Sequence, residues 1–251
     1  MAGVLGIDIG GSGIKGNLVD PLDGSLLAER FKVETPVPSL PDAVAKVVAQ
    51  IADHFEYQGR IGSTFPAIVK RGVTWSAANV DPAWVGCDAA ALFSQVSGRE
   101  VVVVNDADAA GVAEMAFGAG RGRPGTVVLL TFGTGIGSAV FHNGVLIPNT
   151  EFGHLQFAGH ESVEDWAAAR VRDDERLSWE VWAGRVNKLL HHLNKLLSPD
   201  LLILGGGVSR RWDKWSQYLN IPVEVVPAGL RNEAGIVGAA LLAANEERAG
   251  A

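Results

Sequence analysis

Two glycine-rich stretches combine backbone donors with charged or hydroxyl side chains that could bind phosphate. The first runs from Asp8 to Lys15 (DIGGSGIK) and the second from Thr131 to Gly137 (TFGTGIG). A tight glycine turn exposes successive backbone N–H groups, which can face phosphate oxygens. In the first stretch, Asp8 could also hold Mg²⁺ through water and Lys15 could reach a phosphate. This stretch is neither a Walker A loop nor a Rossmann fingerprint, because no helix is expected directly after its glycines.

A third turn, Gly205–Gly207, follows the apolar run LLIL. For each turn taken alone, the alternative is a structural hairpin without a ligand. Two such turns facing each other could clamp a phosphate chain from both sides, and the repetition therefore favours ligand binding. The candidate donor-binding residues are Asp8, Gly10, Gly11, Ser12, Gly13, Lys15, Thr131, Gly133, Thr134, Gly135, Gly205, Gly206 and Gly207.

Each glycine turn must be positioned by the strands on either side of it. Residues 4–9 and 126–132 are apolar runs that predict buried strands, and 14–19 and 138–141 predict the strands that return. Further strands are expected around 25–34, 101–104, 201–204 and 222–226, and helices over 41–55, 107–117, 179–197 and 233–247. The repeated strand–turn–strand unit predicts an α/β protein of two lobes. We expect residues 1–105, with the C-terminal helix of about 235–251, to form a small lobe and residues 106–234 a large one.

Composition narrows the class of protein. Of the 251 residues, 47% are hydrophobic and 20% charged, as in ordinary globular proteins. The net charge of −7 argues against a nucleic-acid partner. Cys87 is the only cysteine, which excludes an internal disulfide and a multi-cysteine zinc site and fits a reducing, cytoplasmic setting. No apolar run is long enough to predict a membrane-spanning helix.

The motifs DIGGSGIKG, NDADAAG, LTFGTGIGSAV, EFGH and LGGGVS, in this order, resemble those of the repressor–open-reading-frame–kinase (ROK) family of sugar kinases. The resemblance covers essentially the whole chain. It implies the actin/hexokinase-like (ribonuclease H-like) ATPase fold, in which two lobes flank a ligand cleft. The segments SAANVDPAW (76–84), SPDLLILGGGVS (198–209) and LRNEAGIVGAA (230–240) are similar to the branch of the family that uses polyphosphate on glucose.

The resemblance implies that Asp106 is the general base that takes the proton from the sugar 6-hydroxyl. A positioned carboxylate typically contributes roughly 10²–10⁴-fold to such a step. Asp106 follows an apolar strand and opens a helix, whose N-terminus would keep it ionised, whereas Asp108 is the better candidate for a purely capping residue. The sugar-binding positions implied by the family are Asn79, Asn105, Asp106, Glu151, His154 and Glu164. Amides and carboxylates can pair with neighbouring hydroxyls.

The chain departs from the wider family where many members bind zinc. There, a histidine and three cysteines follow the Glu-x-Gly-His segment, whereas residues 155–164 (LQFAGHESVE) contain no cysteine. We therefore expect no zinc site. His160 is left without metal-binding partners, and packing, with Trp166 as a candidate, must hold the loop. This absence and Ser12, where the wider family usually has threonine, favour the polyphosphate-using branch.

The expected reaction converts glucose to glucose 6-phosphate with polyphosphate, ATP or both, and with Mg²⁺. A polyanion needs cations beyond the cleft, and the possible track is Arg121, Arg123, Arg210 and Arg211; scattered solubilising charge is the alternative.

An ATP-dependent kinase for glucose, mannose or N-acetylglucosamine stays open as an alternative function. A non-catalytic sugar-sensing regulator is less favoured, because such members carry an N-terminal DNA-binding segment and here residue 4 already starts a strand. The resemblance also implies a homodimer.

Overall fold

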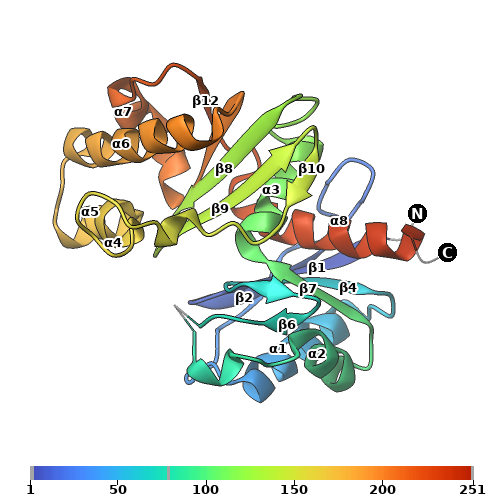
Figure 1. The fold of residues 1–251 in the computed structure, drawn as a ribbon. Coiled ribbons are helices and arrows are strands. Elements are labelled where there is room, and N and C mark those ends of the chain that lie inside the picture. Colours follow the sequence, from blue (N-terminus) through green and yellow to red (C-terminus); the bar gives the residue numbers. More distant parts are fainter. Residues whose placement is uncertain (1–2, 78–79, 250–251) are drawn as a thin grey trace. The chain divides into compact units, whose positions relative to one another are not determined.

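The computed structural model describes residues 3–77 and 80–249, which divide into two compact units (Figure 1). Unit 1 comprises Met1–Ala113 and Glu233–Ala251, and unit 2 comprises Glu114–Asn232. The first division falls inside helix α3 (Asp106–Phe117), whereas the sequence had placed a boundary just before that helix. The C-terminal helix α8 (Ala234–Ala249) belongs to unit 1.

Unit 1 is built on a five-stranded sheet in the order β3-β2-β1-β4-β7. β1 pairs antiparallel with β2 and β2 with β3, while β1, β4 and β7 run parallel. The bounds are β1 Val4–Gly10, β2 Gly13–Val19, β3 Phe31–Val33, β4 Ile61–Phe65 and β7 Val101–Asn105. A small hairpin, β5 (Val69–Lys70) with β6 (Val73–Thr74), the turn η1 (Pro82–Trp84) and helices α1 (Pro41–His54) and α2 (Ala89–Ser97) complete this unit with α3 and α8.

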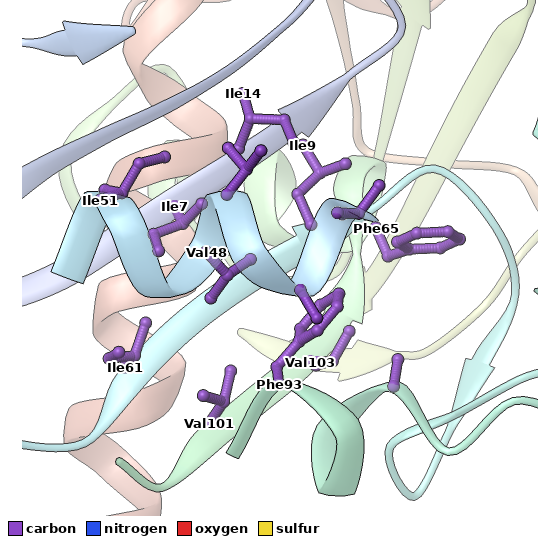
Figure 2. Packing of buried hydrophobic residues seen from close by; sticks show 14 of the residues in the cluster. Ile7, Ile9, Ile14, Val48, Ile51, Ile61, Phe65, Phe93, Val101 and Val103 are labelled. Carbon is purple, nitrogen blue, oxygen red and sulfur yellow. The ribbon is translucent and has the colours of Figure 1, made fainter. Parts of the chain in front are cut away.

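Helices α1 and α2 lie on one face of this sheet and α8 lies on the other (Figure 1). Alternate side chains of a strand point to opposite faces. Ile7 and Ile9 of β1 accordingly pack with Val48 and Ile51 of α1 in the buried cluster drawn in Figure 2. The core of unit 1 therefore sits between the sheet and α1, directly beneath the first glycine turn.

The opposite face of the sheet is glycine-rich where α8 crosses it. A Cβ added to Gly6 would lie 2.0 Å from the Ile236 carbonyl oxygen, and one added to Gly62 would lie 1.9 Å from that of Ala239. No side chain fits at such distances, so these glycines allow the helix backbone to approach the strands. This close approach fixes α8 against β1 and β4, which carry the first candidate site.

Unit 2 repeats the same sheet plan in the order β10-β9-β8-β11-β12. β8 pairs antiparallel with β9 and β9 with β10, while β8, β11 and β12 run parallel. The predicted echo of the opening strand–turn–strand unit is thus confirmed. The strands are β8 Thr126–Phe132, β9 Ile136–His142, β10 Val145–Ile147, β11 Leu201–Gly206 and β12 Glu224–Pro227. The helices are α4 Glu164–Ala167, α5 Ala169–Asp174, α6 Trp179–Leu197 and α7 Trp212–Trp215, with short turns η2 Phe152–His154, η3 Gly207–Arg211, η4 Ser216–Tyr218 and η5 Arg231–Glu233, the last reaching into unit 1.

Two fully buried tryptophans organise the core of unit 2. Trp182 of α6 packs edge-on against Phe132 of β8 and against Trp215 of α7. Its indole N–H donates to the Ala167 carbonyl at 3.0 Å, and that of Trp215 donates to the Val208 carbonyl at 3.1 Å. Buried indoles need such acceptors. These side chains are therefore core, and they bring α6 and α7 against the strand that precedes the second glycine turn.

Several elements differ from the sequence-based expectation. The strand expected around 25–34 is confined to β3, because the preceding residues form turns and a single bridge between Val19 and Leu26. Helix α2 was not predicted, although its ends are marked: the Asp88 side chain accepts from the Ala91 N–H, and Gly98 ends the helix with φ 70°. Helix α1 begins with Pro41 as expected, but neither Ser39 nor Asp42 caps it; Leu40 occupies the cap position without a side-chain hydrogen bond.

Among the helices of residues 3–77 and 80–249, none is long and apolar enough to cross a bilayer.

Candidate functional site

The first glycine turn is the tip of the β1–β2 hairpin. Asp8 pairs with Lys15 across the two strands, and the Lys15 Nζ lies 3.5 Å from the Asp8 Oδ2. Gly10 pairs with Gly13, which leaves Gly11 and Ser12 exposed at the tip. The structure thus brings the predicted carboxylate and the predicted ammonium together behind an open turn. An anion at this turn would meet Lys15 from one side.

Thr64 of β4 positions Asp8, a role that the sequence did not reveal. The fully buried Thr64 hydroxyl accepts from the Ile9 N–H at 3.0 Å and donates to the Asp8 Oδ1 at 3.0 Å. Gly235 of α8 leaves room for the same carboxylate, because a Cβ there would lie 2.8 Å from Oδ1. β2, through Lys15, and β4, through Thr64, therefore contact the Asp8 side chain, and α8 leaves room for it. The sequence signal was weak, because two adjacent polar residues, Ser63 and Thr64, interrupt this parallel strand.

Asn105 and Asp106 occupy the junction between β7 and α3. The Asn105 Oδ1 accepts from the N–H groups of Ala107 and Asp108 at 2.9 and 3.0 Å, and its amide donates to the Ala67 carbonyl at 3.1 Å. Asn105 thus caps the helix, the role that the sequence had favoured for Asp108. The Asp106 Oδ1 accepts from the Ala107 N–H at 2.8 Å. The half-buried Asp106 carboxylate therefore lies at the helix N-terminus, where the dipole favours a negative charge.

Glu151, His154 and Glu164 form a cluster in unit 2. The two ring nitrogens of His154 lie 3.9 Å from the Glu151 Oε2 and 4.0 Å from the Glu164 Oε1. Burial raises the pKa of the Glu151 carboxyl; nearby His154 lowers it in part, and the Glu164 charge raises it further. An exposed histidine between two carboxylates offers donors and acceptors to a ring of hydroxyls. The structure therefore brings together three of the predicted sugar-binding residues.

Glu164 also contacts the second glycine turn. Its Oε2 accepts from the Ile136 N–H at 3.1 Å. A Cβ on Gly135 would lie 2.5 Å from that oxygen, and a Cβ on Gly153 would lie 2.9 Å from it and 2.3 Å from the Ile136 carbonyl oxygen. The two glycines are thus required by the position of one carboxylate. Predicted hydroxyl-binding and phosphate-binding groups meet here in unit 2.

Ser138 of β9 holds the segment that carries Glu151. Its hydroxyl donates to the Thr150 carbonyl at 2.6 Å and accepts from the Phe152 N–H at 3.0 Å, and the Thr150 hydroxyl donates to the Ser138 carbonyl at 3.1 Å. Glu151 is therefore fixed by hydrogen bonds on both of its chain neighbours. No role was predicted for Ser138, although it comes directly after the second glycine stretch.

The third glycine turn lies directly beside the second. Gly205 and Gly206 pair in parallel register with Thr131 and Phe132. Gly206 has φ 83°, and a Cβ there would lie 2.2 Å from the Phe132 carbonyl oxygen. Only glycine fits this position. The second and third predicted donor-binding turns thus form one continuous edge of the unit 2 sheet, with Gly133, Thr134 and Gly207 exposed on it.

The loop that replaces the family's zinc-binding segment is held by packing. Phe157 and His160 exchange backbone hydrogen bonds at 3.1 and 2.9 Å. The rings of both residues pack on Trp166, with centroids 5.8 and 5.9 Å away. The predicted role of Trp166 is therefore confirmed, and His160 stacks on that indole. Within the part of the chain that the structure describes, no cluster of three or more His, Cys, Asp or Glu side chains could hold a metal.

The four arginines of the predicted track do not share one environment. Arg210 and Arg211 are exposed in η3, immediately after the third turn, and Arg121 is exposed between α3 and β8. Arg123 forms an ion pair with Glu224 of β12, which compensates its charge. Arg210 and Arg211 are therefore the better placed cations. Asn79, the remaining predicted sugar ligand, lies outside the described residues.

A cavity of about 340 Å³ opens in unit 1 beside the first turn. Gly10 and Gly11 line one wall, and the segment from Thr35 to Ser39 lines another, with the Thr35 hydroxyl donating to the Gly10 carbonyl at 2.5 Å. The lining is largely apolar and includes Phe65 and Trp84. Asp8, Lys15 and Asp106 are not part of it. The cavity therefore borders the backbone of the first predicted phosphate-binding turn but not the side chains of Asp8, Lys15 and Asp106.

Comparisons with known proteins find relatives along most of the chain. The family model described as ROK family matches residues 4–169. Polyphosphate glucokinase of Mycobacterium tuberculosis is 51% identical over 237 residues, which are 94% of this chain and 89% of that protein. The crystal structure of inorganic polyphosphate/ATP-glucomannokinase from Arthrobacter sp. strain KM has a TM-score of 0.94 and 47% identity, covering 98% of this chain and 100% of the other. A ROK family glucokinase from Streptomyces griseus, in complex with glucose and AMPPNP, has a TM-score of 0.82 and 26% identity, covering 96% and 99%.

The raised pKa of Glu151 predicts an acid-side loss of sugar affinity. As pH falls, Glu151 takes up a proton at a higher pH than an ordinary glutamate, because burial and Glu164 disfavour its charged form. The protonated group loses acceptor capacity for a sugar hydroxyl. We expect glucose dissociation constants, measured by calorimetry, to rise on the acid side, and we expect Glu151→Gln to bind glucose weakly with a flatter pH profile.

The same substitution should not destabilise the fold at neutral pH. A carboxyl whose pKa is raised on folding binds more protons when folded, so its contribution to stability declines as pH rises through that pKa. Replacing the carboxylate with a neutral amide removes the free-energy cost of burying its charge. A Glu151→Gln variant with a lower melting temperature at neutral pH, or with the wild-type pH dependence of glucose binding, would contradict the assignment.

Proposed function

Because the chain belongs to the ROK family, we propose that it transfers a phosphoryl group from inorganic polyphosphate to the 6-hydroxyl of glucose, giving glucose 6-phosphate. One observation carries the proposal: the Glu164 carboxylate contacts His154 on one side and the second glycine turn on the other. Hydroxyl-binding groups beside a phosphate-binding turn are what phosphoryl transfer to a sugar requires. The polyphosphate glucokinase and the glucomannokinase named above support polyphosphate as donor.

Asp106 acts as the general base in this proposal. Its carboxylate takes the proton as the sugar oxygen attacks the terminal phosphoryl group, and the bond to the rest of the donor breaks. Asn105 holds the start of α3, and thereby Asp106, through its three hydrogen bonds. The cluster of Glu151, His154 and Glu164 binds sugar hydroxyls. The glycine turns and Lys15 bind the donor phosphates.

Mg²⁺ fits the residues around Asp8. This carboxylate stands near Lys15 with one oxygen bonded to the Thr64 hydroxyl, and Mg²⁺ is commonly held by one or two carboxylates together with substrate phosphates and water. Asp8 would hold the ion with the donor, and the ion would neutralise phosphate charge.

We further place the enzyme in the cytoplasm as a homodimer. The free thiol of Cys87 fits a reducing compartment, and Val181 and Leu196 expose apolar surface on α6.

ATP as a second donor and mannose as a second acceptor form the alternative function. The glucomannokinase from Arthrobacter is named for both donors and for both sugars, and it shares 47% identity with this chain. Glucose and mannose differ at one hydroxyl, so the preference depends on a single contact. Either activity would use the same base and the same turns.

The Asp106→Asn variant tests the mechanism. Asparagine keeps an oxygen for the Ala107 N–H, so the start of α3 stays capped while the base is lost. We expect kcat for glucose phosphorylation to fall by about 10²–10⁴-fold, with glucose binding still measurable by calorimetry. Turnover close to that of the wild type would remove Asp106 from the chemistry. Asp106→Ala, which also removes the oxygen, should abolish turnover.

Polyphosphate binding by Arg210 and Arg211 predicts a steep dependence on salt. When cationic side chains bind a polyanion, counterions are released from it. This release is less favourable at higher salt, so binding weakens as salt rises. We expect the KM for polyphosphate to rise strongly between about 50 and about 200 mM salt, and the double variant Arg210→Ala/Arg211→Ala to flatten that slope. Arg30→Ala/Lys195→Ala removes the same charge from exposed positions elsewhere and is the matched control. Equal slopes for the two double variants would rule out the track.

A further inference from the structure

Glu114 is a buried carboxylate that has no part in the chemistry above. It lies in α3 and is 1% exposed. Its Oε2 accepts from the N–H groups of Ala119 and Gly229 at 2.8 and 3.0 Å, and its Oε1 accepts from the Leu230 N–H at 2.7 Å. A buried charge is tolerated where hydrogen-bond donors replace its water. Here three backbone N–H groups from two separate segments do so.

Gly118 leaves space for the Glu114 carboxylate. A Cβ on Gly118 would lie 2.0 Å from the Glu114 Oε2 and 2.7 Å from its Cδ. Gly118 has an ordinary φ, so backbone freedom does not account for a glycine here. The absence of a side chain at Gly118 therefore accommodates the Glu114 carboxylate. Gly118 and Glu114, four positions apart, thus form one close contact.

The segment that Glu114 holds lies against the third glycine turn. The Ala228 N–H donates to the Leu204 carbonyl at 3.0 Å. A Cβ on Gly205 would lie 3.3 Å from the Ala228 Cβ, so the two backbones are in close contact. Glu114 then bonds the next two N–H groups, those of Gly229 and Leu230. The carboxylate therefore ties the end of α3 to the segment that packs against Gly205.

We propose that Glu114 is a positioning residue for the phosphoryl donor: it fixes residues 228–230 and, through them, the turn Gly205–Gly207. The inference rests on the proposed function, because that function assigns the turn to the donor. The sugar-binding cluster is held separately, by Ser138 and by the contact of Glu164 with Ile136. Loss of the Glu114 contacts should therefore weaken use of the donor and leave glucose binding unchanged.

Glu114→Gln tests the proposal with little change in volume. The amide NH₂ must face at least one backbone N–H, so at least one hydrogen bond to a charged acceptor is lost. We expect the KM for both ATP and polyphosphate to rise about tenfold, while the glucose dissociation constant stays within about twofold of wild type. Hydrogen exchange at the Gly229 and Leu230 amides should become faster. Glu180→Gln, at an exposed position of α6, is the control.

Gly118→Ala perturbs the same contact from the other side and should produce the same separation of donor and glucose effects. Its control is Gly184→Ala, because a Cβ on Gly184 meets no atom within 4 Å. Equal losses of donor and glucose affinity, or faster exchange at Gly229 and Leu230 with an unchanged donor KM, would overturn the proposal. Wild-type protein that phosphorylates no sugar with either donor would instead contradict the proposed function, while the exchange measurement would still test whether Glu114 fixes the segment.

Discussion

The Glu164 carboxylate connects the two kinds of chemistry found in unit 2. One oxygen faces His154 and so belongs to the group that can bind hydroxyls. The other accepts from the Ile136 N–H and so fixes the second glycine turn. Gly135 and Gly153 lack side chains where this carboxylate packs. A change in the position of Glu164 would therefore alter the predicted sugar-binding and phosphate-binding groups together.

Close backbone approach is the second constraint, and glycine provides it in both units. In unit 1, Gly6 and Gly62 let α8 lie directly on β1 and β4, and Gly238 lets the same helix meet Ala109 of α3. In unit 2, Gly206 lets the third turn meet Phe132 beside the second. The abundance of glycine in this chain thus reflects contacts between backbones as well as turns that face a ligand. Asp8 of β1 and Asp106 of α3 both lie on elements fixed in this way.

The sequence predicted those parts of the fold that follow from local pattern. Apolar runs predicted the bounds of β1, β8 and β11 within a few residues, and amphipathic stripes did the same for α1 and α6. The repeated strand–turn–strand unit revealed the shared sheet plan. The glycine turns could be named for the same reason, whereas Asp106 and the Glu151–His154–Glu164 set were named from the resemblance to the family. The supporting residues could not. Thr64, Ser138 and Glu114 act through backbone atoms distant in sequence, and Asn105 rather than Asp108 caps α3 because its amide faces two N–H groups.

Phosphoryl transfer measured with a small panel of sugars and donors tests the central claim most directly. Glucose, mannose and N-acetylglucosamine would each be incubated with polyphosphate and with ATP, and the sugar 6-phosphate formed would be quantified. The account predicts glucose 6-phosphate from polyphosphate at a kcat/KM that exceeds the value for N-acetylglucosamine with either donor. Absence of any product from polyphosphate, with efficient phosphorylation by ATP alone, would contradict it.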